Sequence, residues 1–291
     1  MLLYVPFIKV KNGEKVNTTD WSLFGFPRNA SGKIAVLGIA YDSTSYLGKG
    51  TAAFPIAVRL ASHGIEWESE SGSVQEREAI DFGDLIPSPD SENFVNETKE
   101  FMDGIWSQGF RKFLVLGGNH SITIPVIDFL NEKGIVKKYL QFDAHGDARE
   151  EDRGTRFSFA CTFRRISEIL GSENCTIAGV RSIAGDEKDF LTKSNTIFGK
   201  SPDLGLLESR VKEADYISVD MDVFEHASVT NPEPYYGLTL SQVLASLSGK
   251  KVGFDIVEGI PQQYFGDDTA TAGALLARKA LFLLGDSNDK N

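Results

Sequence analysis

The sequence is poor in cysteine and has no apolar run long enough to cross a lipid bilayer. Two of its 291 residues are cysteines, Cys161 and Cys175, too few to crosslink a chain of this length. We therefore expect a reducing, cytoplasmic environment. The apolar start of the chain lacks a basic leader and a small-residue cleavage site, so we do not interpret it as a signal peptide. No run approaches the roughly 18 apolar residues of a membrane helix, and no membrane partner is expected.

Basic residues are scarce relative to acidic ones. Lys and Arg number 30 against 41 Asp and Glu, which gives a formal net charge of −11. Binding to nucleic-acid phosphates requires clustered Lys and Arg, so this balance argues against a nucleic-acid partner. It is compatible with a small cationic ligand.

The chain also lacks a Pro- or Ser-rich linker, an internal repeat and a low-complexity segment. We predict one domain over residues 1–291, with an irregular N-terminal extension (1–31) and a polar tail (286–291). Short apolar segments predict buried strands at 34–40, 113–116, 139–142, 176–179, 216–219 and 252–257. Helical patterns cover 92–108, 121–133, 204–213, 239–247 and 269–284. This alternation predicts an α/β fold with a mainly parallel sheet.

Potential metal ligands follow three of the predicted strands. They are His120, Asp143, His145, Asp147, Asp220 and Asp222. Ligands of parallel α/β folds bind beyond the carboxyl ends of the strands, so these side chains are expected to meet. Asp143, His145 and Asp147 also alternate along the chain, and alternate residues of an extended segment face the same side. At the end of a buried strand, an unpartnered carboxylate such as Asp143 or Asp220 would be costly.

This mixture of carboxylates and imidazoles suits Mn²⁺ or another first-row divalent ion. Six ligands for two ions imply bridging carboxylates, with the ions about 3.5–4 Å apart. Each pattern also has a structural interpretation. The Asp-x-His-x-Asp segment fits a hydrogen-bonded turn, His120 fits a structural histidine, and Asp220 and Asp222 fit a cap on a turn. Three strand ends that each supply ligands favour the metal site over these alternatives.

Two shorter patterns have structural interpretations alone. Gly117 and Gly118 are expected to let the backbone turn sharply before His120. The segment 81–84 begins with the Asp-Phe-Gly sequence of protein kinases, but no kinase loop or lysine strand accompanies it. We interpret it as a turn at the end of a strand.

Together, these motifs resemble the ureohydrolase superfamily of arginase, agmatinase and formimidoylglutamase. Segments 117–121, 143–147 and 218–222 are similar to the family's Gly-Gly-Asp-His-Ser, Asp-Ala-His-x-Asp and Ser-x-Asp-x-Asp signatures. The resemblance implies an arginase-like, three-layer α/β/α sandwich that assembles as a trimer or hexamer. It also implies two Mn²⁺ ions, one held by His120, Asp143, Asp147 and Asp220, the other by Asp143, His145, Asp220 and Asp222.

The resemblance further implies hydrolysis of a guanidino C–N bond, most simply that of agmatine to putrescine and urea. In that reaction the two ions yield a hydroxide near neutral pH. Asp147 would carry a proton to the leaving amine, and Glu258 would bind the guanidinium of a small cationic substrate. Asn231 and His226 are further expected substrate contacts.

Departures from the family pattern lie on the substrate side. Asn119 replaces the usual Asp beside His120, and Phe159 replaces the His of arginases and agmatinases, although Phe cannot transfer a proton. His226, in place of the usual Pro, fits either a substitute imidazole or an exposed loop residue.

These departures leave a formimidoylglutamase-like hydrolase, an arginase-like hydrolase and an inactive metal-binding relative as alternatives. Basic contacts for the carboxylates of a formimidoyl substrate would come from Arg149, Arg153, Arg156, Arg164 and Arg165.

Overall fold

The computed structural model describes residues 22–26, 33–46, 48–66, 68–69, 72–73, 79–199, 202–225, 227–229, 231, 233, 237–262 and 267–285. In this part of the chain, eight strands form one sheet in the order β4-β1-β5-β10-β9-β6-β7-β8. Their bounds are β1 (Ile34–Ile39), β4 (Ala79–Leu85), β5 (Lys112–Gly117), β6 (Tyr139–Phe142), β7 (Cys175–Val180), β8 (Asn195–Phe198), β9 (Tyr216–Asp220) and β10 (Gly253–Val257). Every neighbouring pair in this sheet is parallel. A separate antiparallel ribbon pairs β2 (Glu68–Ser69) with β3 (Gly72–Ser73).

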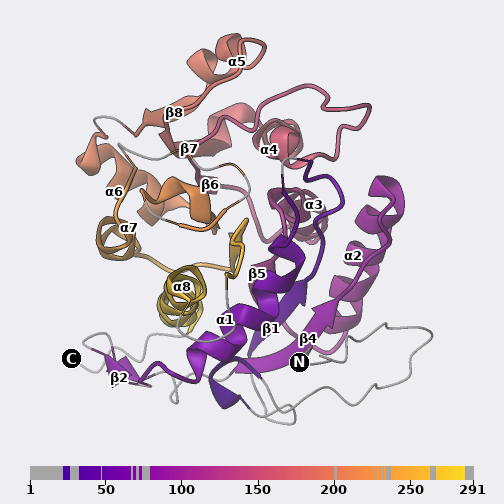
Figure 1. Ribbon diagram of the computed structural model, residues 1–291, viewed down its shortest axis with the longest axis vertical. Coiled ribbons are helices and arrows are strands. Elements are labelled where there is room, and N and C mark those ends of the chain that lie inside the picture. The colour runs from indigo at the N-terminus through magenta and orange to yellow at the C-terminus, as the bar shows by residue number, and fades with distance from the viewer. Residues whose placement is uncertain are drawn as a thin grey trace.

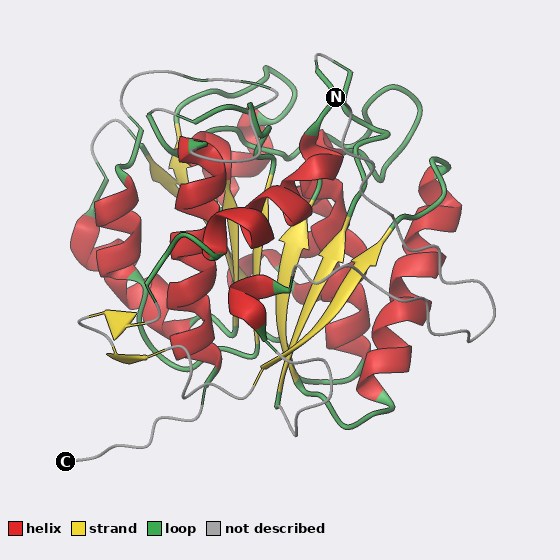
Figure 2. Ribbon diagram, turned by 60° about the horizontal axis from the view of Figure 1, so that its bottom comes forward, coloured by secondary structure: helices red, strands yellow, loops and turns green. Residues whose placement is uncertain are grey.

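Helices cover both faces of the sheet. They are α1 (Phe54–Ser62), α2 (Ser91–Trp106), α3 (Thr123–Glu132), α4 (Thr162–Leu170), α5 (Lys188–Lys193), α6 (Leu204–Glu213), α7 (Leu240–Ser246) and α8 (Asp268–Leu284). Alternation along β1 shows how the layers form, because Ile34 and Val36 pack in the core beneath α1 and α8, whereas Ala35 and Leu37 pack beneath α2 and α3. Figures 1 and 2 show the twisted sheet between the two helix layers. The predicted three-layer α/β/α sandwich is confirmed.

The predicted strands and helices are confirmed with small shifts at their ends. Helices α4 and α5 and four strands, β2, β3, β4 and β8, were not predicted. One of them, β4, contains the segment 81–84, so its interpretation as a turn at a strand end is wrong. Asp81 is buried within the strand, where its carboxylate lies 2.8 Å from Arg59 Nε and also accepts the Leu23 amide. This ion pair compensates the buried charge of Asp81 within the strand.

The predicted extension and tail lie at the two ends of the chain. In the predicted N-terminal extension, residues Leu23–Gly25 form one 3₁₀ turn, and the predicted tail at 286–291 lies outside the described residues. The single-domain organisation stays a prediction.

Four adjacent strands bring distant parts of the sequence together. The order β5-β10-β9-β6 places the carboxyl ends of four parallel strands side by side at one edge of the sheet. His120 follows β5, Glu258 follows β10, Asp220 ends β9 and Asp143 follows β6. The topology therefore assembles the site from segments separated by up to about half of the sequence.

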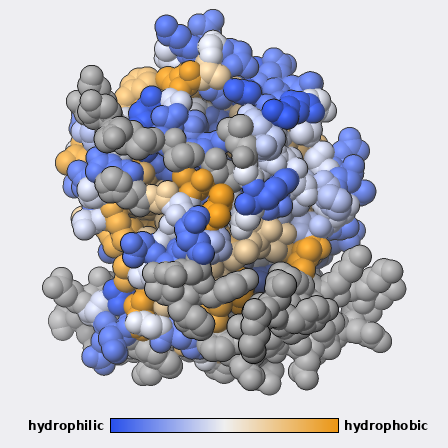
Figure 3. Space-filling model, viewed as in Figure 1, coloured by the Kyte–Doolittle hydropathy of each residue, from blue (hydrophilic) through white to orange (hydrophobic). Residues whose placement is uncertain are grey.

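The surface is mainly polar, with a few large apolar side chains exposed. Among the described residues these are Ile183, Phe198, Leu204 and Leu206. Figure 3 shows hydrophilic residues over most of the visible upper part of the molecule, with apolar residues scattered between them. None of the described helices has the length and apolarity that a membrane span requires.

Candidate metal centre

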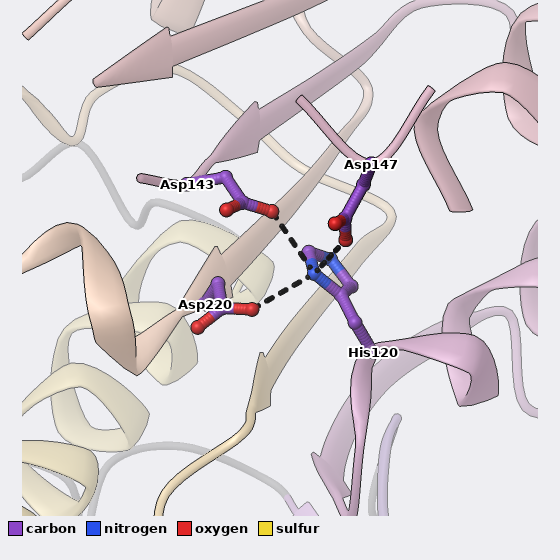
Figure 4. Close-up of side chains that lie close together, drawn as sticks. All are labelled: His120, Asp143, Asp147 and Asp220. Carbon is purple, nitrogen blue, oxygen red and sulfur yellow. Dashed lines mark hydrogen bonds and ion pairs between the residues drawn. The ribbon is translucent and has the colours of Figure 1, made fainter. Parts of the chain in front are cut away.

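Three carboxylates converge on one nitrogen of His120 (Figure 4). The Nδ1 atom of His120 lies 3.0 Å from Asp220 Oδ2 and 3.2 Å from both Asp143 Oδ2 and Asp147 Oδ2. All four side chains are buried. A ring nitrogen carries at most one proton and cannot donate to three oxygens at once. A divalent cation bound to this nitrogen and these oxygens would compensate the buried charge, so the four residues fit a metal ion.

A second cluster adjoins the first and shares Asp143 with it. It consists of Asp143, His145 and Asp222. His145 Nδ1 lies 2.7 Å from Asp222 Oδ2 and 3.9 Å from Asp143 Oδ1. Asp143 thus directs one oxygen toward each cluster, as a bridging ligand would. Asp220 belongs to the first cluster and is linked to the second because its Oδ1 accepts the Asp222 amide at 2.8 Å.

The ligands meet for a different local reason from the one predicted. The segment after β6 is not extended, and Asp147 has a left-handed backbone with φ of +43°. Asp220 likewise precedes a 3₁₀ turn, Met221–Val223, which its carboxylate caps, and Asp222 lies within that turn. Tight turns, rather than strand alternation, therefore aim these side chains. The capping interpretation of Asp220 is also correct and coexists with its place in the cluster.

Gly118 allows its backbone to lie close to the backbone of Tyr41, and it does not serve to make a sharp turn. It lacks a positive φ, but a Cβ here would overlap the carbonyl oxygen of Tyr41. The amide of Gly118 donates to Ile39 and that of Asn119 to Tyr41, at 2.9 and 2.8 Å. These bonds hold the turn that carries His120 against the end of β1.

Burial and mutual repulsion perturb the pKa values of the clustered groups. Burial and the neighbouring carboxylates raise the pKa values of Asp143, Asp147 and Asp220. Burial alone would lower the pKa of His145, but Asp222 and Asp143 raise it to about 11. Burial alone would raise the pKa of Asp222, but His145 lowers it. The clusters therefore carry more negative charge than their own imidazoles neutralise.

A relay of hydrogen bonds orients the His120 ring. Its Nε2 lies 2.9 Å from Ser218 Oγ, and Ser218 donates to Asp255 Oδ1 at 2.5 Å. Thr123 and Tyr216 also donate to the buried Asp255 carboxylate, at 2.8 and 2.9 Å. Since the Ser218 proton is used, Ser218 accepts from Nε2–H, and Nδ1 presents its lone pair to the cluster.

Ser218 was not singled out in the sequence. The available signal was its position two residues before Asp220, on the same face of a predicted strand. Arg181 was also missed as a contributor to the site.

Arg181 forms hydrogen bonds with the backbone of the loop that carries Asp222 and Glu233. Its Nη2 donates to the Asp222 and Glu233 carbonyls at 2.7 Å each, and its Nη1 donates to the Val223 carbonyl at 3.2 Å. One guanidinium therefore joins the backbone of a predicted ligand to a segment that lines the neighbouring cavity.

That cavity opens beside the clusters and has a volume of about 440 Å³. It is lined by Tyr46, His145, Asp147, Arg149, Phe159, Ala160, Ser182, Ile183, Ala184, Glu187, Asn231 and Glu233. Asn231, a predicted substrate contact, has a buried Oδ1 with no hydrogen-bond partner among the described residues.

Glu258 and His226 are placed differently from Asn231. Glu258 is 3% exposed and does not line the cavity, and its Oε1 accepts the His120 amide at 2.7 Å. It has a left-handed backbone, with φ of +66°. Its carboxylate therefore contacts the turn that carries His120. His226 lies outside the described residues.

The fold and this centre define an α/β/α protein whose buried carboxylates and imidazoles are arranged to hold metal ions. The chain belongs to the arginase family, whose model matches residues 32–283. An agmatinase of Pyrococcus horikoshii is 31% identical over 266 residues, which are 85% of this chain and 89% of that protein.

Solved structures agree with this assignment. The agmatine ureohydrolase of Thermoplasma volcanium has a TM-score of 0.76 at 31% identity, covering 87% of this chain and 90% of that one. The formimidoylglutamase of Bacillus subtilis has a TM-score of 0.79 at 23% identity, with coverage of 96% and 97%, and supports the fold. The resemblance to ureohydrolases and to their agmatinase-like branch is confirmed.

Proposed function

We propose that the protein is a binuclear manganese hydrolase that cleaves the guanidino C–N bond of agmatine, releasing putrescine and urea. The observation that carries this proposal is the convergence of three carboxylate oxygens within 3.2 Å of His120 Nδ1. Two relatives that are 31% identical are named as an agmatinase and an agmatine ureohydrolase, which supports the choice of substrate.

The two clusters supply the ligands for two ions. His120, Asp143, Asp147 and Asp220 would hold one Mn²⁺, and Asp143, His145, Asp220 and Asp222 the other. Four aspartates balance the charge of two divalent ions, so the centre as a whole would be close to neutral. When bound, such a pair of ions supplies a water of strongly lowered pKa.

Residues around the cavity have complementary tasks. Asp147 belongs both to the first cluster and to the cavity lining, so it can take a proton there and return it to the leaving amine. Glu258 lies behind the turn of His120 rather than on the cavity lining, so its charge would attract the guanidinium from there, whereas Asn231 Oδ1 would accept one of its N–H groups. The Glu233 carboxylate, on the cavity wall and 39% exposed, offers a partner for the distal amine. His226 stays a predicted contact.

The partners of the arginines near the second motif disfavour a formimidoylglutamate-like substrate. Arg149 pairs with Asp152 at 3.1 Å, and Arg153 stacks on Tyr46. The remaining three, Arg156, Arg164 and Arg165, all lie within 3.7 Å of Glu168. A substrate with extra carboxylates would have to displace these contacts. An inactive relative is disfavoured because all six predicted ligands meet in the two clusters.

The proposal is tested by loading the purified protein with Mn²⁺ and assaying agmatine, arginine, 4-guanidinobutyrate and formiminoglutamate. We expect urea from agmatine at a kcat/KM well above that for the other substrates. Formamide from formiminoglutamate as the main product would favour the second branch of the family. No product from any of them, with metal bound, would overturn the hydrolase assignment.

A further inference from the structure

Two aromatic rings form one side of the cavity beside the clusters. Tyr46 and Phe159 both line it, with ring centroids 5.6 Å apart and an angle of 40° between the ring planes. They are the aromatic residues among its described lining. Phe159 is 7% exposed, and Tyr46 is half-buried. An apolar surface therefore adjoins His145 and Asp147, which line the same cavity.

Arg153 covers Tyr46 from an unusual backbone conformation. Its guanidinium carbon lies 3.7 Å from the centroid of the Tyr46 ring. Asp152 and Thr155 exchange backbone hydrogen bonds of 3.0 and 3.1 Å, and the two residues between them, Arg153 and Gly154, have φ of +50° and +81°. Such a turn favours Asn, Asp or Gly at its first central position. Arginine is disfavoured here, yet this turn places its guanidinium on Tyr46.

The two residues before Tyr46 are held through their side-chain hydroxyls. Asn119 Nδ2 donates to Thr44 Oγ1 at 2.8 Å and to Ser45 Oγ at 3.0 Å, and Asn119 Oδ1 accepts the Ser121 hydroxyl at 2.6 Å. The turn that carries His120 is thus tied to the segment that carries Tyr46. Of the departures from the family pattern, Phe159 contacts the Tyr46 ring, and Asn119 contacts the two residues before it.

The charges around Tyr46 decide which part of a ligand can lie against it. Arg153 covers the ring, and Arg149 lines the same cavity. The Arg153 guanidinium, with Arg149 paired to Asp152, disfavours the cationic end of a ligand on this side. The carboxylates of Asp147, Glu187 and Glu233 attract it elsewhere on the lining. The aromatic side is therefore suited to an uncharged, apolar part of the ligand.

We propose that Tyr46 and Phe159, with Arg153 stacked on Tyr46, form an aromatic wall that binds the methylene chain of the substrate. The wall selects amidines with a long, unbranched alkyl chain over amidines with a short one. This inference rests on the proposed function for the amidine end of the substrate. The wall itself is a binding surface that can be tested without turnover.

Straight-chain alkylamines from ethylamine to hexylamine are suitable probes, because they carry a cation and a chain but no amidine to hydrolyse. Their dissociation constants for the Mn²⁺-loaded protein are measured by calorimetry. In the wild type, each added methylene is expected to tighten binding about two- to fourfold. Tyr46→Ala is expected to flatten this gradient, and Tyr46→Phe to retain it.

Arg153→Asn tests the wall without disturbing the fold, because Asn suits the left-handed turn and its short side chain no longer reaches the Tyr46 ring. We expect an unchanged melting temperature and a gradient clearly shallower than in the wild type. The matched control is Arg156→Asn, which alters an exposed arginine three residues away that pairs with Glu168. It should keep the full gradient.

The outcomes show separately whether the aromatic wall exists and whether the protein hydrolyses a guanidine. An equal gradient in the wild type and in Tyr46→Ala would overturn the wall, whether or not agmatine yields urea. If Tyr46→Ala does not fold, an unchanged gradient in Arg153→Asn overturns the part assigned to Arg153, and Phe159→Ala then tests the wall. A normal gradient without urea from any guanidine would leave the wall standing and overturn the proposed function.

Discussion

Ser218 Oγ lies 2.9 Å from His120 Nε2, and this hydrogen bond determines which ring nitrogen faces the carboxylate cluster. The relay continues to Asp255, whose carboxylate is buried among three hydroxyl donors. A residue that contacts no substrate thus prepares His120 to act as a ligand through Nδ1.

Replacing Ser218 is expected to weaken metal binding. Ser218→Ala removes the acceptor of the Nε2 proton and frees the ring to rotate or change tautomer. Affinity for Mn²⁺ should fall by roughly 10- to 100-fold, the usual cost of losing such a partner. Competition with a metal-sensitive dye measures the effect. Ser246→Ala is the control, since Ser246 is also buried and hydrogen-bonded but lies on α7. Equal affinities in both variants would argue against the relay.

Asp143 and His145 should differ in how many ions they retain. Asp143 faces both clusters, so Asp143→Asn is expected to lose both ions after dialysis. His145 belongs to the second cluster alone, so His145→Asn should retain about one ion per chain. Elemental mass spectrometry measures the number of metal ions bound per chain in each variant. The exposed Asp103, which pairs with Lys133, provides a control variant in Asp103→Asn. Loss of a single ion from Asp143→Asn would contradict a bridging role.

Glu258 accepts the His120 amide, and we propose that its negative charge also attracts the substrate. Glu258→Gln keeps an oxygen that can accept the His120 amide but removes the negative charge. We expect an unchanged melting temperature and a kcat/KM for agmatine about tenfold lower, from the loss of the negative charge that attracts the guanidinium. Glu258→Ala should in addition lower the melting temperature. An unchanged kcat/KM in Glu258→Gln would mean that Glu258 serves only to accept the His120 amide.

The buried Lys251 makes stability depend on pH. Its Nζ donates to the Val211 carbonyl at 2.7 Å, and burial, only partly offset by Asp215, lowers its pKa from 10.5 to about 8. Between these two values the unfolded chain binds more protons than the folded one, so the contribution of Lys251 to stability rises with pH.

Chemical unfolding of the wild type and of Lys251→Met tests this dependence. From pH 7 to pH 9.5, the difference in unfolding free energy should shift by about 2 kcal/mol in favour of the wild type. Lys250→Met, at the adjacent exposed position, should show no such shift. A constant difference for Lys251→Met would mean that Lys251 titrates normally.

The sequence was sufficient for residues whose position follows from the ends of strands. Asp143 and Asp220 each follow an apolar strand, and parallel strands end at one edge of a sheet, so their meeting could be predicted. The turns that aim Asp147 could not, because a left-handed conformation at a non-glycine residue leaves no clear pattern.

Contacts of side chains with residues far away in the sequence could not be predicted either. The guanidinium of Arg181 reaches backbone carbonyls, which exist at every position and carry no sequence signal. Tyr46 and Phe159 are more than a hundred residues apart, and their pairing depends on the folded loops. In the eight-stranded sheet, the two strands that were missed, β4 and β8, lie at its two edges.

The most direct test of the central claim is the stoichiometry of products formed from agmatine by the Mn²⁺-loaded protein. Urea and putrescine are quantified together, with Asp143→Asn as the matched control. The account predicts equal amounts of the two products from the wild type and neither from the variant. Equal activity in Asp143→Asn, or putrescine without urea, would contradict hydrolysis at this centre.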